Sequence, residues 1–164
     1  MAAISIPALV GEFAVDGRLA DVVSIAEDRL LALDDEHSKL LSIEFREGTW
    51  KIASSTPVPK YPVRVVVDSS RTNCYVTSLW SRTLTRFAIS QRDGLLKRTG
   101  ELDLQFEPRE HCLIQSGSHL VIASAFDAAL SVVDLSSFTI ARNERLSGHN
   151  IGGLAIKSNG GLVL

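Results

Sequence analysis

The sequence predicts an all-β fold, specifically a partial β-propeller made of tandem four-stranded antiparallel blades. Three observations predict it. A repeat of 42–46 residues runs through the 164-residue chain, each repeat contains four strand-like segments, and no segment has a sustained helical period. A repeat of this length is typical of propeller blades, because each blade buries its apolar face only by stacking on its neighbours.

The repeat is clearest between residues 62–89 and residues 108–135, which align at a shift of 46 without a gap. The same template recurs upstream at residues 21–45 with one gap, and it begins again at residues 153–164. Turn-forming residues fall at corresponding places in the copies. Chance does not readily produce four copies of this kind, so the repeat determines the predicted fold.

Each unit predicts four strands of different character. The first is a near-continuous apolar run, such as residues 63–67, which is typical of a strand covered on both faces. A polar turn leads to a second apolar strand. The third strand alternates, as in Thr85, Phe87 and Ile89, which predicts that one of its faces is more buried than the other. The fourth, such as residues 95–98, is short and polar, as expected of an exposed outer strand.

These strands divide the chain into blades of one incomplete propeller domain that spans residues 1–164. The expected blades cover residues 19–56, 62–105 and 108–147, with the start of a further blade at 150–164 and a possible outer strand of a preceding blade at 8–15. Propellers close their ring with about four to eight blades. We therefore expect the remaining blades to come from a longer chain or from self-association.

The composition of the chain argues against nucleic acid as a partner and against a membrane span. Seventeen basic and nineteen acidic residues give a net charge of -2 without a basic run, so we expect no binding to nucleic acid. No run of 18 apolar residues is present, so we expect no membrane span. Cys74 and Cys112 belong to no CxxC or CxxCH sequence, and the simplest interpretation is that both are small buried hydrophobic residues.

Catalytic signatures are missing from the sequence. It contains no GxSxG, HExxH, GxxxxGK[ST] or GxGxxG motif, so it predicts no catalytic residue, no metal site and no cofactor in this chain. His111 and Cys112 are adjacent in a strand and point to opposite faces, which argues against a shared metal ion.

The candidate ligand-binding residues share one expected face of the propeller. The links from fourth to first strand and from second to third strand emerge there, around the mouth of the central channel. The candidates are Arg64, Trp80, Arg82, Glu110, His111, His149 and Asn150. Arg64 and Glu110 hold matching positions in successive repeats, and they could bind a ligand or pair with each other across adjacent blades. Trp80 could stack on a ligand or pack over the neighbouring blade.

Residues 74–89, with the sequence CYVTSLWSRTLTRFAI, resemble the YVTN family of bacterial β-propeller repeats. Tyr75, Val76 and Thr77 match the family's strand, with Ser78 in the place of its Asn. The family's usual Pro-Asp-Gly turn is not preserved. The resemblance implies a periplasmic or extracellular protein, whereas this chain contains no positively charged segment of a secretory signal. In some members of the family the propeller is joined to a c-type cytochrome domain.

Three functions are compatible with these observations. We expect a non-catalytic β-propeller module that binds a protein or small-molecule partner as part of a longer protein. The alternative is the propeller portion of a periplasmic c-type-haem redox protein whose haem domain lies outside this chain. A third possibility is a propeller hydrolase such as a lactonase, with side chains from several blades converging on a metal ion in the channel. The fold alone names no partner.

Overall fold

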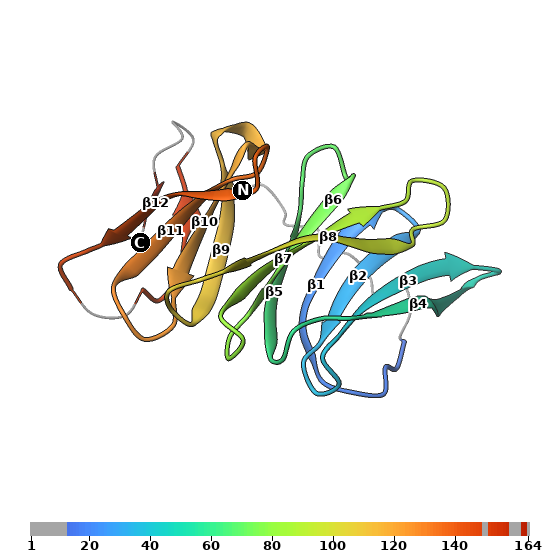
Figure 1. Cartoon of the computed structure of the whole chain (residues 1–164). Helices are drawn as coiled ribbons and strands as arrows, with labels where there is room; N and C mark the ends of the chain where they lie inside the picture. The colour runs from blue at the N-terminus through green and yellow to red at the C-terminus, as the bar shows by residue number, and fades with distance from the viewer. Residues whose placement is uncertain (1–12, 149–150, 158–161, 164) are drawn as a thin grey trace, which may run out of the picture.

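The computed structural model describes residues 13–148, 151–157 and 162–163. Three four-stranded antiparallel sheets and one two-stranded sheet follow one another along the chain. Figure 1 shows the sheets side by side as blades. The predicted fold class, an all-β partial β-propeller, is confirmed. None of the described elements is a helix long and apolar enough to cross a membrane.

In each blade the sheet order follows the chain order, so successive strands pair as hairpins. The first blade contains β1 (Leu19–Ala26), β2 (Arg29–Asp34), β3 (Lys39–Arg46) and β4 (Thr49–Pro57). The second contains β5 (Pro62–Val67), β6 (Asn73–Ser78), β7 (Thr83–Ile89) and β8 (Leu96–Asp103). The third contains β9 (Pro108–Ile114), the short 3-10 turn η1 (Gln115–Gly117), β10 (His119–Ser124), β11 (Ala129–Asp134) and β12 (Thr139–Arg145). The two-stranded sheet consists of β13 (Ala155–Ile156) and β14 (Leu162–Val163).

Most of the hydrophobic core lies between neighbouring blades. Leu33 and Leu40 of the first blade pack with Val76 and Phe87 of the second in one buried cluster. A second cluster joins the second and third blades in the same way. A third cluster packs the far face of the third blade against residues from Ile151 onward. Neighbouring blades therefore bury most of these apolar faces against each other, as the repeat predicted, while a smaller cluster around Ala32, Leu41 and Ile43 lies on the first blade alone.

The outer strands differ from the prediction. The sequence predicted short fourth strands, whereas β4, β8 and β12 contain nine, eight and seven residues. Each includes one extra residue at a bulge, at equivalent places in the three blades. Polar composition concealed their length, because an exposed edge strand needs no apolar pattern to pair along its inner side.

The first strand of every blade also contains a bulge, close to its start. One residue of the strand has no partner in the neighbouring second strand. These unpaired residues are Ala20, Val63 and Arg109. A bulge locally increases the twist and changes the direction of the side chain that follows, and bulges are frequent beside functional sites.

Candidate functional site

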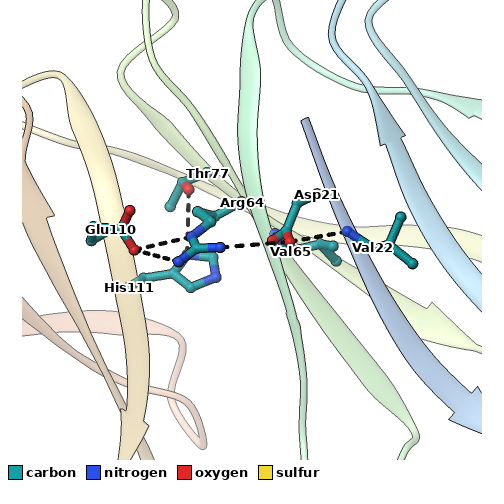
Figure 2. Close-up of polar contacts among 7 residues, drawn as sticks. All are labelled: Asp21, Val22, Arg64, Val65, Thr77, Glu110 and His111. Atoms are coloured by element: carbon teal, nitrogen blue, oxygen red, sulfur yellow. Dashed lines mark hydrogen bonds and ion pairs between the residues drawn. The ribbon is translucent and has the colours of Figure 1, made fainter. Parts of the chain in front are cut away.

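Three charged side chains lie in a row across the first strands of the three blades. Asp21 on β1, Arg64 on β5 and Glu110 on β9 each follow directly after the bulge of their strand, so they hold equivalent positions. These first strands contact one another, β1 with β5 and β5 with β9, as the innermost strands of a propeller do. Figure 2 shows Arg64 between the two carboxylates.

Arg64 is bound tightly to Glu110. Its Nε and Nη2 both donate to Oε2 of Glu110, at 3.0 and 2.6 Å. Its Nη1 lies 3.6 Å from Oδ1 of Asp21. The hydrogen bond to Glu110 is the main reason that the pKa of Arg64 is raised above its ordinary value, although partial burial opposes the shift. The pairing of Arg64 with Glu110 across adjacent blades, one of the two predicted alternatives, is confirmed.

The row still has polar atoms free for a ligand. The Arg64 side chain is 41% exposed, and within the described residues its Nη1 makes no hydrogen bond. The other oxygen of Glu110, Oε1, likewise has no hydrogen-bond partner among these residues. Asp21 differs, because its oxygens accept the backbone N–H groups of Val22 and Val65, both at 3.0 Å. Asp21 therefore joins two blades, while the ion pair of Arg64 and Glu110 offers one donor and one acceptor.

His111 lies beside this row but belongs to the interface between the second and third blades. Its Nδ1 is 3.3 Å from the hydroxyl of Thr77, and its buried Nε2 has no hydrogen-bond partner among the described residues. Burial, helped by the charge of Arg64, lowers the pKa of His111 to about 3. The imidazole is therefore neutral at physiological pH.

The lowered pKa of His111 predicts a stability that depends on pH. The unfolded chain binds a proton on His111 below its ordinary pKa of 6.5, whereas the folded chain does not until about pH 3. Since the unfolded state binds more protons in this window, the free energy of unfolding falls as pH decreases from about 6.5 towards 3. We expect His111→Gln to flatten this dependence between pH 6.5 and 5, as measured by urea denaturation at each pH.

The matched control for this prediction is His119, a half-buried histidine of the same blade at the start of β10. The variant His119→Gln should keep the slope of the unmodified protein. Equal slopes in the unmodified protein and His111→Gln would show that His111 is not buried neutral.

Trp80 and Arg82 lie in the turn between β6 and β7, where they contact protein groups. The exposed rings of Tyr61, Trp80 and Phe126 form a continuous aromatic ridge, with Trp80 6.3 Å from Tyr61 and 6.0 Å from Phe126 between ring centroids. Arg82 pairs with Glu107 at 2.5 Å. Trp80 therefore packs with a residue of the neighbouring blade, in agreement with the second alternative for this side chain.

The structure brings together only part of the predicted site. It places Arg64 and Glu110 in contact and His111 next to them, while Trp80 and Arg82 lie in a separate turn. His149 and Asn150 lie outside the described residues, as does most of the predicted strand at residues 8–15. Sequence reasoning missed Asp21 as a member of the row. The signal was available, because Asp21 precedes Arg64 by 43 residues, which is one repeat.

Similarity to solved structures supports the β-propeller fold. No family model and no curated protein matches the chain. Among solved structures, it is similar to the periplasmic gluconolactonase PpgL of Pseudomonas aeruginosa, with TM-score 0.72 and 20% identity over 88% of this chain and 45% of that one. It is similar to a putative 6-phosphogluconolactonase of Bacteroides uniformis, with TM-score 0.73 and 13% identity over 87% and 45%. It is also similar to the β-propeller domain of Swd1 from Myceliophteria thermophila, with TM-score 0.71 and 14% identity over 83% and 46%.

These similarities define the class as β-propeller proteins, and the chain spans less than half of the length of these three structures. They also correct the predicted function. The expectation of a non-catalytic binding module is contradicted, because several structural neighbours are gluconolactonases or putative 6-phosphogluconolactonases. The alternative of a haem redox protein receives no support either. Sequence reasoning relied on the absence of catalytic motifs, and a propeller site assembled from single residues of several blades leaves no such motif.

Proposed function

We propose that this chain forms part of a catalytic β-propeller that hydrolyses lactones, with Arg64 and Glu110 as its contribution to the active site. The observation that carries the proposal is the partly exposed ion pair of Arg64 and Glu110, in which Nη1 of Arg64 and Oε1 of Glu110 make no hydrogen bond within the described residues. The bulges that direct these residues in β5 and β9 support it. The similarity in fold to two lactonase-type proteins suggests the reaction class.

The proposed reaction needs a general base and a hydrogen-bond donor that stabilises the developing oxyanion. Oε1 of Glu110 accepts a proton from water while the water oxygen bonds to the lactone carbonyl carbon. Nη1 of Arg64 donates hydrogen bonds to the carbonyl oxygen, which becomes negatively charged. The acyl carbon–oxygen bond of the ring then breaks, and the proton held by Glu110 passes to the departing alkoxide. The product is a hydroxy acid, whose carboxylate binds Arg64 until it leaves.

A direct assay tests this proposal. The purified protein is incubated with δ-gluconolactone and with an unrelated simple lactone, and acid release is followed by a pH indicator above the spontaneous rate. Catalysed acid release supports the proposal, and its abolition in Glu110→Gln supports the assigned base. Acid release at the spontaneous rate with both lactones, in protein shown to be folded by circular dichroism, would contradict it.

Finer features of the protein belong to the same proposal. We infer that its repeats are of the YVTN type, since the matching residues Tyr75, Val76 and Thr77 lie in β6 and are buried. We also infer that the partner is a small molecule, that the reaction needs no cofactor because Arg64 supplies the positive charge, and that further blades complete the ring. Hydrolysis insensitive to a metal chelator is the expected result.

A further inference from the structure

A pocket with two arginines lies between the first and second blades, on the face opposite the turn that contains Trp80. The turns from first to second strand and from third to fourth strand meet on that face. The pocket has a volume of about 220 Å³ and is lined by Ile25, Ala26, Asp28, Arg29, Arg71, Ile89, Ser90 and Gln91. Since a water molecule occupies roughly 30 Å³ of liquid, the pocket has room for an ion of several heavy atoms.

Arg29 enters this pocket from the first blade. It begins β2, and its side chain runs beneath the turn between β7 and β8 of the second blade, where Gly94 passes closely over it. A Cβ atom at Gly94 would lie 2.8 Å from Cδ of Arg29 and 3.1 Å from its Nε. Gly94 also has a φ of +68°, which favours glycine. The Nε of Arg29 is buried and has no hydrogen-bond partner in the described part of the chain.

Arg71 reaches the same pocket from the second blade. Its Nη1 donates to the carbonyl oxygen of Ile25 at 3.2 Å, and within the described residues its other side-chain N–H groups make no hydrogen bond. The side-chain amide of Gln91 donates to the carbonyl oxygen of Arg71 at 2.6 Å and holds this turn in place. The two arginines therefore come from opposite blades and line one cavity.

No carboxylate neutralises this pair within the described residues, where neither Arg29 nor Arg71 makes an ion pair. Glu44 is the cross-strand partner of Arg29, but its carboxylate pairs with Arg46 at 2.9 Å. Asp28 is the one acidic residue that lines the pocket, so the lining carries one more positive than negative charge.

We propose that this pocket binds an oxyanion, a phosphate or carboxylate group, between Arg29 and Arg71. Guanidinium groups match the geometry of both anions and bind them through paired N–H donors. An oxyanion here would give Nε of Arg29 an acceptor, which it lacks among the described residues, and would offset the net positive charge of the lining. Such a ligand would also join the two blades, so binding should stabilise the folded state. The site is distinct from the proposed catalytic row and does not depend on it.

Thermal unfolding in different salts tests the site. The melting temperature is measured in potassium phosphate, potassium acetate and potassium chloride at equal ionic strength and pH 7. At a concentration about tenfold above its Kd, the bound anion should raise the melting temperature by about 3–6 °C relative to chloride. A rise in phosphate alone assigns the site to phosphate groups, and a rise in acetate alone assigns it to carboxylates. Titration calorimetry with the stabilising anion should give one site per chain.

Variants separate this site from general salt effects. The double variant Arg29→Met/Arg71→Met keeps the apolar stems and should lose the anion-dependent rise. The variant Arg109→Met, which removes an exposed arginine from β9, should keep it. A purely structural role of the two arginines would lower the melting temperature equally in all three salts. That result, or no difference between salts in the unmodified protein, would overturn the proposal.

Discussion

Replacing Arg64 by Met should lower kcat/KM for lactone hydrolysis about 100- to 1,000-fold. Loss of one donor to the developing oxyanion has an effect of this size. In this protein the loss should fall mainly on kcat, because Nη1 of Arg64 makes no hydrogen bond to another described residue and can donate to the oxyanion. Initial rates of acid release over a range of lactone concentrations give kcat and KM separately.

Two further variants make this expectation specific. Arg109→Met removes the neighbouring exposed arginine at the bulge of β9, and it should leave kcat/KM within about twofold. Arg64→Lys retains the charge but loses the fork of donors, so it should recover only part of the activity. Because Arg64 also joins two blades, the melting temperature of each variant must be measured. Equal activities of Arg64→Met and Arg109→Met would contradict the assigned role of Arg64.

The fold was predictable because a propeller sequence repeats the same order of apolar strands and polar turns in every blade. Any one apolar run, such as residues 63–67, is ambiguous alone, since short apolar runs occur in strands and in buried helices. Its recurrence with matching turns at residues 112–114 removed this ambiguity. The lengths of β4, β8 and β12 were not predictable in the same way. Those strands pair along one edge only, and their polar side chains give no sign of how many residues take part in the pairing.

The candidate site was only partly predictable. The repeat aligned Arg64 with Glu110, and that alignment alone indicated that the two side chains could meet across adjacent blades. The repeat could not show which carboxylate oxygens of the row bind protein groups and which have no partner among the described residues. Asp21 holds the same position as the other two, yet its carboxylate is occupied by the backbone of β1 and β5. His111 offered a possible ligand in the sequence, but its partly buried position between two blades lowers its pKa and keeps it neutral.

The pocket between Arg29 and Arg71 was not visible in the sequence at all. The two residues are 42 positions apart and belong to different blades. Arg29 begins a strand of the first blade, and Arg71 lies in a turn of the second. They converge only because the sheets stack, which brings together the turns of adjacent blades on the face opposite Trp80. Propeller sites on this scaffold arise from single residues of successive blades, and for this reason motif searches within one segment do not find them.

Replacing Phe87 by Ala should lower the free energy of unfolding by about 3–5 kcal/mol, the usual cost of removing a fully buried aromatic side chain. Phe87 has no exposed surface and packs between the first two blades with Leu33, Leu40 and Val76. For a chain of this size, the melting temperature should fall by about 6–20 °C.

The matched control for Phe87→Ala is Phe126→Ala, which removes a ring that is 53% exposed and should shift the melting temperature far less. Both are measured by circular dichroism at one protein concentration. A small effect of Phe87→Ala would mean that the blades are not held together by their facing sheets. The packing of Leu33 and Leu40 on the second blade would then not be the source of stability, and the first strands would lack the support that keeps Arg64 and Glu110 in register.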